Sequence, residues 1–119
     1  MKWFVVITRQ PGENFPVDVS ILQAAQTFLT EKIAAGIILL SVSCPAKKED
    51  WAIVEANSEA DLRTLISQYP LFRCLNFEAT QNIPRDVNDW PKRPDLMSSL
   101  DAIEILIAKI KHPKLCRAA

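Results

Sequence analysis

Residues 51–80 read WAIVEANSEADLRTLISQYPLFRCLNFEAT and contain the pattern that decides the fold. The stretch begins with an apolar run over residues 51–56, which is typical of a strand. Ser58, followed three residues later by Asp61, resembles a helix capping box, and apolar residues at helical spacing continue until Pro70. Residues 73–81 then alternate between two faces. The stretch therefore predicts a strand, a helix and a second strand.

The residues before this stretch add two strands and one helix. Residues 2–9 are bulky, β-branched or aromatic, and residues 37–44 are apolar on both faces, so each run predicts a buried strand. Between them, Asp18 or Ser20 is a suitable N-cap for a helix, and Gly36 is well placed to end it. A short polar connection joins residues 37–44 to residues 51–56, which predicts a hairpin.

The order β-α-β-β-α-β predicts an α+β, ferredoxin-like fold, with a four-stranded antiparallel sheet and both helices on one face. The other face of the sheet is expected to be uncovered. Because the first three strands carry apolar residues on both sides, something must cover that face. A second copy packed sheet on sheet is the economical answer, so we expect a homodimer or a higher homo-oligomer.

The composition changes beyond residue 82. Three prolines around Trp90 indicate a tether, and apolar residues at helical spacing then predict a helix over about residues 97–111. We therefore divide the chain into a domain over residues 1–82 and a proline-containing tether with a C-terminal helix over residues 83–119. The helix is expected to pack either on its own domain or on a neighbouring subunit.

Charge and glycine content exclude several classes of function. Fourteen basic and fourteen acidic residues give a formal net charge of zero, which argues against nucleic acid and against a membrane as partners. Gly12 and Gly36 are the only glycines, so the glycine-rich loops that bind nucleotides are absent. No carboxylates are spaced as metal ligands. We expect neither a cofactor nor a metal.

Cysteine usage and the lengths of the apolar runs bear on the cellular compartment. Cys44, Cys74 and Cys116 are odd in number and widely spaced, which predicts reduced thiols rather than a disulfide framework. No apolar run is long enough for a signal-peptide core or a membrane span. We therefore expect a cytoplasmic protein.

Residues 1–82 resemble the muconolactone isomerase-like family of small dimeric α/β barrels. The residues that carry this resemblance lie between positions 58 and 80: Ser58, Asp61, Leu62, Leu65, Ile66, Tyr69, Pro70, Leu71, Phe72, Asn76, Phe77, Glu78 and Thr80. The resemblance implies a ferredoxin-like dimer with a cleft between sheet and helices that accepts small lactones or related organic acids. The first helix departs from the family, because residues 21–28 have lost most of the titratable groups found there.

Glu78 is the candidate catalytic residue. Isomerisation of an unsaturated lactone needs a base that moves a proton next to a carbonyl, with donors that stabilise the enolate oxygen. Glu78 lies on the polar face of the last strand, where apolar walls are expected to raise the pKa of its carboxyl. The alternative is an interface or surface carboxylate paired with a basic residue. The candidate ligand-binding residues are Trp3, Ser41, Ser43, Trp51, Asn76 and Thr80.

Two functions are consistent with these residues. The first is a non-catalytic or divergent oligomeric module whose cleft binds a small hydrophobic organic ligand, and the depleted first helix favours it. The alternative is a cofactor-free isomerase that moves a proton in a small lactone or organic acid, with Glu78 as the base.

Overall fold

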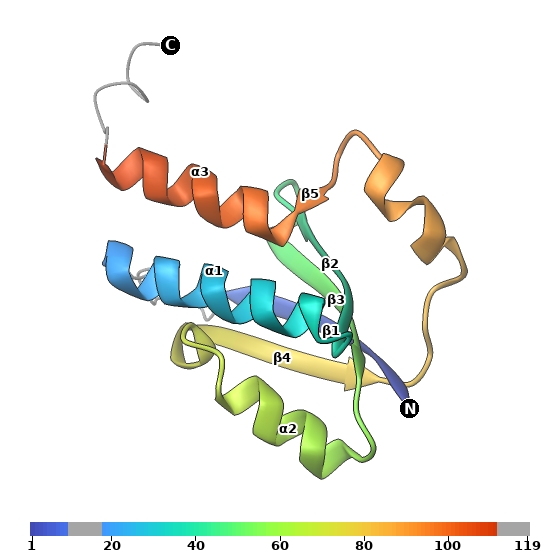
Figure 1. Cartoon of the computed structure of the whole chain (residues 1–119). Coiled ribbons are helices and arrows are strands. Elements are labelled where there is room, and N and C mark those ends of the chain that lie inside the picture. The colour runs from blue at the N-terminus through green and yellow to red at the C-terminus, as the bar shows by residue number, and fades with distance from the viewer. Residues whose placement is uncertain (10–17, 112–119) are drawn as a thin grey trace.

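The computed structural model describes residues 1–9 and 18–111, and this part of the chain forms a five-stranded antiparallel sheet with helices (Figure 1). The elements follow in the order β1 (Lys2–Arg9), α1 (Val19–Ala34), β2 (Ile38–Cys44), β3 (Glu49–Glu55), α2 (Glu59–Ser67), η1 (Phe72–Cys74), β4 (Leu75–Thr80), η2 (Arg85–Lys92), β5 (Met97–Ser98) and α3 (Ser99–Lys111). Here η1 and η2 are short 3-10 helices.

The expected four strands and two helices of residues 1–82 are present, and the expected end signals cap the helices. Asp18 is the N-cap of α1, and its carboxylate accepts a hydrogen bond from the backbone N–H of Ser20 at 2.9 Å. The hydroxyl of Ser58 accepts the backbone N–H of Asp61 at 3.1 Å at the start of α2. Gly36, at a φ of 75°, follows α1 in the left-handed conformation that glycine adopts without strain. These local predictions are confirmed.

The sheet has the strand order β4-β1-β3-β2-β5, and all neighbouring strands are antiparallel. The prediction of a four-stranded sheet is wrong by one strand. Met97 and Ser98 form the short strand β5, which pairs with Ser43 and Val42 of β2. The fifth strand exists because the chain beyond the tether returns along the edge of β2 before α3 begins.

The three α-helices cover one face of the sheet. Leu22 and Leu29 of α1, Leu62 of α2 and Ile103 of α3 share a buried cluster with the inward side chains of the strands, such as Val5 of β1. The C-terminal helix packs in cis, since α3 contacts α1 and β2 of its own domain. Among the described residues, no helix is long and apolar enough to cross a membrane.

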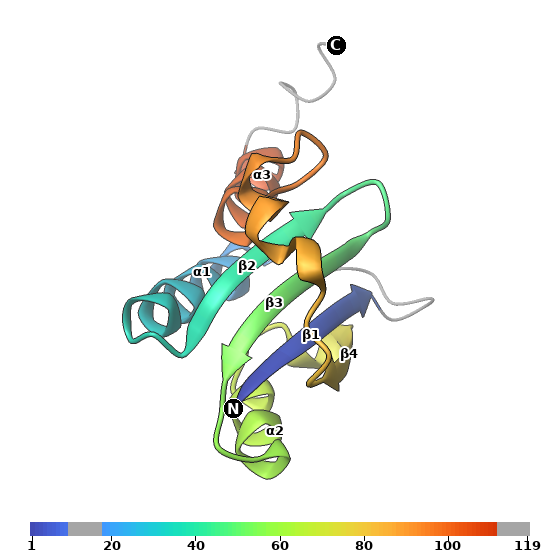
Figure 2. The same cartoon turned by 90° about the vertical axis from the view of Figure 1, so that its right-hand side faces the viewer.

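The opposite face of the sheet is partly covered by η2, so the expectation of an uncovered face is wrong for its β2–β3 half. Trp90 is only 1% exposed, and its ring centroid lies 5.6 Å from that of Phe4 and 5.0 Å from that of Trp51. Val42 and Ile53 on the same face are buried as well. Figure 2 shows η2 crossing β2 and β3 on the side opposite α1. Trp90 of the tether thus covers part of the face on which the sequence predicted a second copy.

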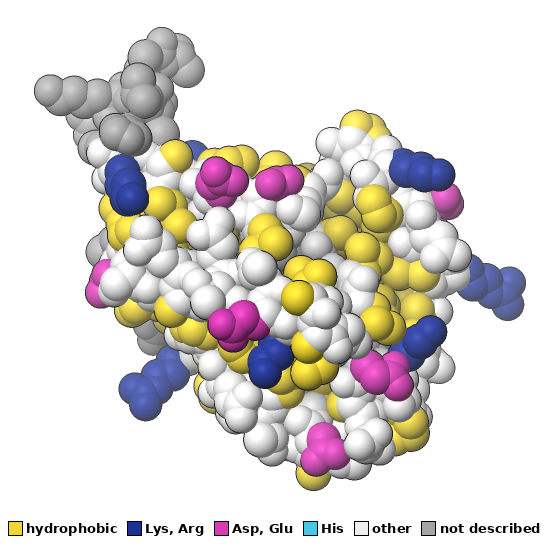
Figure 3. Space-filling model, in the orientation of Figure 1, with side chains coloured by type: hydrophobic (Ala, Val, Ile, Leu, Met, Phe, Trp, Pro, Cys, Tyr) yellow, Lys and Arg dark blue, Asp and Glu magenta, His cyan; other side chains and the backbone are white. Residues whose placement is uncertain are grey.

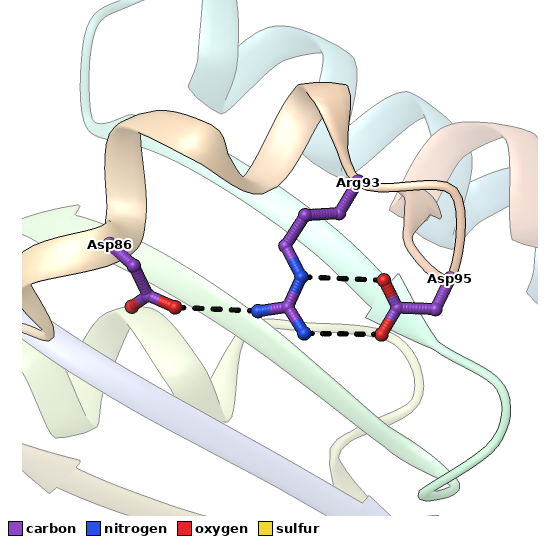
Figure 4. Close-up of polar contacts among 3 residues, drawn as sticks. All are labelled: Asp86, Arg93 and Asp95. Atoms are coloured by element: carbon purple, nitrogen blue, oxygen red, sulfur yellow. Dashed lines mark hydrogen bonds and ion pairs between the residues drawn. The ribbon is translucent and has the colours of Figure 1, made fainter.

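Ion pairs brace the segment that carries Trp90. The Arg93 guanidinium lies 3.3 Å from a carboxylate oxygen of Asp86 and 3.2 Å from one of Asp95, so it bridges η2 to the following turn (Figure 4). The Arg93 side chain is 39% exposed. Water and salt therefore weaken these ion pairs, and the buried indole of Trp90 is the stronger anchor.

Candidate functional site

The residues of the candidate site lie where the helix-facing side chains of three strands meet near one end of the sheet. The strand register places Asp50 of β3 opposite Ile7 of β1 on one side and opposite Ser43 of β2 on the other. Paired residues in an antiparallel sheet share a face. Because Ile7 packs against the core beneath the helices, Asp50 and Ser43 also face the helix layer. A carboxylate and a hydroxyl are thus brought to the apolar side of the sheet.

A cleft of about 360 Å³ opens above these residues, between the sheet and α3. Its volume falls in the range of small-molecule sites in proteins. Its polar lining includes Ser43, Asp50 and Tyr69. The apolar lining is supplied mainly by β1, the segment after α2, and α3: Ile7, Leu71, Leu75, Ile103, Ile105 and Leu106. The arrangement suits a small molecule with an apolar body and at least one polar group.

Burial raises the pKa of the Asp50 carboxyl above its ordinary value of 3.8. The hydroxyl of Ser43, which hydrogen-bonds to Asp50, and the positive charge of Arg9 act in the opposite direction without cancelling the effect of burial. Burial also raises the pKa of the Tyr69 hydroxyl, and the negative charge of Asp50 adds to that increase. Tyr69 is therefore a neutral hydroxyl that can donate a hydrogen bond, and Asp50 can take up a proton more readily than an exposed carboxylate.

Asp50 and Tyr69 also line a second, narrower cavity of about 50 Å³ that runs under α1. The walls of this cavity are almost entirely apolar, and they include Phe28 of α1, whose ring centroid lies 5.4 Å from that of Tyr69. Ser41 closes the cavity on the β2 side, where its hydroxyl donates a hydrogen bond to Ser99 of α3 at 2.8 Å. Asp50 and Tyr69 thus line both cavities. The Ser41–Ser99 hydrogen bond links α3 to the sheet beside the narrower cavity.

Basic side chains surround the larger cleft. Its lining includes Arg9 at the end of β1, Lys48 in the β2–β3 turn and Lys109 near the end of α3. Glu49 lies in the same lining, but its carboxylate accepts a hydrogen bond from the Trp51 indole at 2.9 Å. On the face drawn in Figure 3, basic and acidic side chains are otherwise scattered, without a large patch of one charge. With Asp50 as a second acidic residue, the lining holds three basic and two acidic side chains, an excess of one positive charge in a chain of zero net charge.

Three of the candidate residues from the sequence lie on the helix-facing side of the sheet. Ser43 lines the larger cleft and Ser41 lines the narrower cavity. Trp3 is 8% exposed and belongs to the hydrophobic core, where its indole N–H donates to the backbone carbonyl of Ala56 at 3.3 Å. Trp3 therefore packs as a core residue and lines neither of the two cavities.

The other four candidate residues lie on the opposite face. Glu78 pairs with Val6 and Thr80 pairs with Phe4, so these side chains point away from the helices, as does that of Asn76, two residues before Glu78. Trp51 shares that face and contacts Trp90. Glu78 is exposed, so within the described chain the apolar walls expected around it are not found. The structure thus separates Glu78 from Ser41 and Ser43 by the thickness of the sheet.

Asp50 and Tyr69 are site residues that the sequence patterns did not single out. Asp50 was assigned to the polar connection between two strands, although its alternation with Ala52 and Val54 places it on the helix-facing side. Tyr69 was interpreted as the last apolar residue of the helical stripe and as part of the family resemblance, without a role at the site. The available signal was the two-residue period of a strand, which places Asp50 on the same face as the core positions Ala52 and Val54.

Within residues 1–9 and 18–111, no group of three or more His, Cys, Asp or Glu side chains is arranged to hold a metal ion. Cys44 is a buried free thiol and Cys74 a partly buried one, while Cys116 lies outside the described residues. No model of a known protein family matches the chain, and no curated protein matches it. The class of protein is therefore given by the fold and the cleft alone: an α+β domain with a largely apolar cleft, which a few polar side chains also line, between its sheet and its helices.

Proposed function

We propose that this chain is a ferredoxin-like, muconolactone isomerase-like domain that binds a small hydrophobic organic acid in the cleft between its sheet and its helices. Four of the five strands have the order β4-β1-β3-β2, and α1 and α2 pack on one side of them, which supports a ferredoxin-like core with β5 added at the edge. Two residues of the stretch that carries the family resemblance, Tyr69 and Leu71, line the cleft.

The observation that carries this proposal is that Asp50 and Tyr69 both line a cleft of about 360 Å³ whose other walls are largely apolar. An apolar cleft with a few convergent polar groups is the usual form of a small-molecule site. The basic residues Arg9, Lys48 and Lys109 around it favour an anionic group on the ligand. The ligand class is thus a compact organic acid, with its carboxylate toward the basic residues and its body against α3.

Binding is tested by titrating isotope-labelled protein with a panel of small hydrophobic organic acids that includes muconolactone, and following backbone amide shifts by NMR. The proposal predicts that at least one compound shifts residues around Ser43, Asp50 and Tyr69. Tyr69→Phe removes only the hydroxyl and is expected to weaken that binding several-fold. Thr80→Val on the opposite face is the control and leaves it unchanged. Shifts confined to the opposite face, or none with any compound, would contradict the proposal.

Cofactor-free proton transfer is the second candidate function, and the raised pKa of Asp50 favours it. A partly buried carboxyl is a better acceptor for a carbon-bound proton than an exposed one, and the Tyr69 hydroxyl is a donor for the enolate oxygen that forms. The base originally expected, Glu78, faces away from this cleft. Asp50 is therefore the base we propose for any proton transfer in the cleft.

Deuterium exchange distinguishes the two carboxylates. Muconolactone is incubated with the protein in deuterated water, and exchange and double-bond migration are followed by NMR. Exchange that is lost in Asp50→Asn and retained in Glu78→Gln assigns the chemistry to the cleft. The reverse pattern assigns it to the opposite face. Binding without exchange in the wild-type protein leaves a non-catalytic binding module.

A further inference from the structure

The outer edge of β4 is open in the described part of the chain. β4 lies at the end of the sheet and pairs only with β1. In a strand with one neighbour, the backbone N–H and C=O groups of alternate residues point outward and can pair with another strand. Natural proteins protect such edges with charged side chains, most often lysine, with proline or with a bulge, and Glu78 is the one charged residue of β4. Over Asn76–Thr80, β4 has neither lysine nor proline, and its register with β1 is continuous.

Exposed aromatic surface adjoins this edge. Phe72 is 40% exposed, and its ring stacks on that of Phe77 at a centroid distance of 5.8 Å and an interplanar angle of 24°. Both rings border a groove of about 620 Å³ between α2 and β4, which Leu62 and Ile66 also line. An occupant of the edge would therefore find backbone hydrogen-bonding groups and apolar surface side by side.

We propose that the occupant is a second copy of this chain, docked by antiparallel pairing of β4 with β4 across a two-fold axis. A two-fold at Phe77 sets Phe77 against its copy, and it sets Asn76 opposite Glu78 on each side of the axis. Residues paired in this way share a face, so the Asn76 amide can donate a hydrogen bond to the Glu78 carboxylate. Both residues are exposed on the edge strand, where they are available for this contact.

The side chains of β4 select this register over the next one. A two-fold at Glu78 would set the two Glu78 carboxylates directly opposite each other, and like charges in that position are destabilising. The face of the sheet is the less accessible alternative, because η2 and Trp90 already cover its β2–β3 half. The zero net charge of the chain opposes neither edge pairing nor packing on the face of the sheet. Edge pairing at β4 thus avoids the half of the sheet face that η2 already covers.

Oligomeric mass and a charge-swap rescue test this arrangement. Sedimentation of the full chain is expected to give a concentration-dependent species of twice the chain mass of 13.4 kDa. Asn76→Glu sets like charges opposite one another at both symmetric positions and is expected to weaken dimerisation by about tenfold, less so at high salt. Adding Glu78→Asn to that variant restores the Asn–Glu pairs with the partners exchanged, so the double variant should dimerise like the wild type.

Circular dichroism spectra and melting curves of the single and double variants verify that both remain folded. A wild-type chain that stays monomeric from micromolar to near-millimolar concentration would overturn the proposal. So would a dimer that Asn76→Glu leaves unchanged, because that dimer would use another surface. Neither result bears on ligand binding in the cleft, so this proposal and the proposed function can fail independently.

Discussion

Trp90 and Trp51 pack against each other with ring centroids 5.0 Å apart, which joins a proline-flanked segment of the tether to the centre of the sheet. The indole of Trp90 is almost completely buried, and it also contacts Phe4 of β1. These contacts link the chain after β4 to strands formed by residues far earlier in the sequence. Trp90 is therefore central to the hydrophobic contacts on the face of the sheet opposite the α-helices.

Removal of this side chain is predicted to be strongly destabilising. Trp90→Ala deletes a buried indole and leaves a cavity against the sheet, so the free energy of unfolding should fall by about 3 to 5 kcal/mol. Trp90→Phe keeps an aromatic ring and should cost less. Asp89→Ala, at an exposed neighbouring position, is the control. Urea unfolding followed by circular dichroism gives the values, and a loss below about 1 kcal/mol for Trp90→Ala would mean that η2 contributes little to the fold.

The ion pairs of Arg93 are predicted to matter much less. Arg93→Ala removes the bridge between Asp86 and Asp95, but these side chains are 39% to 55% exposed, and exposed pairs contribute about 1 kcal/mol at most. The effect should shrink further in high salt. Arg63→Ala, which removes an exposed ion pair with Glu59 on α2, is the matched comparison. A loss for Arg93→Ala as large as that for Trp90→Ala would show that the bridge, rather than the indole, holds η2.

The hydrogen bond between Ser41 and Ser99 should be measurable as a coupling energy. Ser99 is only 5% exposed, and its hydroxyl accepts from Ser41 at 2.8 Å. Ser41→Ala or Ser99→Ala alone leaves one hydroxyl without this partner, whereas the double variant removes both, so the double variant should cost less than the sum of the two. We expect a coupling of about 0.5 to 1.5 kcal/mol in a double-mutant cycle of unfolding free energies. Strictly additive losses would argue that this bond does not tie α3 to the sheet.

Local signals predicted most of the fold. Ser58, Asp18 and Gly36 act within one turn of the chain, so their effect on a helix end does not depend on the rest of the structure. The docking of Trp90 could not be predicted in this way. It lies in an irregular segment without strand or helix periodicity, and its contacts with Phe4 and Trp51 depend on how the finished sheet presents its far face.

The candidate site was predicted less well for a related reason. Glu78 and Asp50 are both acidic residues in alternating strands, and the sequence does not say which face of a strand lies under the helices. The register of β1 with its two neighbours decides this, because it places Asp50 opposite Ile7 and Glu78 opposite Val6. Ser41 and Ser43 lie on the helix-facing side because they pair with Ala52 and Asp50 of β3. Tertiary register, rather than residue type, thus separates the two carboxylates.

The partly buried carboxyl of Asp50 should make stability depend on pH in a direction opposite to that of most acidic residues. Burial raises the pKa of Asp50 in the folded chain above its ordinary value of 3.8, so the folded state binds this proton more tightly than the unfolded state does. The associated stability is fully present below pH 3.8 and is lost as the pH rises through the folded pKa. Asp50→Asn cannot ionise and should keep its stability over that window.

The unfolding free energies of wild type and Asp50→Asn, compared from pH 3.5 to pH 8, give the measurement. As the pH rises, the unfolding free energy of Asp50→Asn is expected to increase relative to that of the wild type. The increase should be about 1.4 kcal/mol for each unit by which the pKa of Asp50 in the folded chain exceeds 3.8. Glu78→Gln on the opposite face is the matched control, because it also neutralises one carboxylate but at an exposed position. A difference between wild type and Asp50→Asn that is constant with pH, or that shrinks as the pH rises, would mean that burial does not govern the Asp50 carboxyl. Asp50 would then be a poor proton acceptor, while the apolar walls of the cleft and the Tyr69 hydroxyl would still support ligand binding.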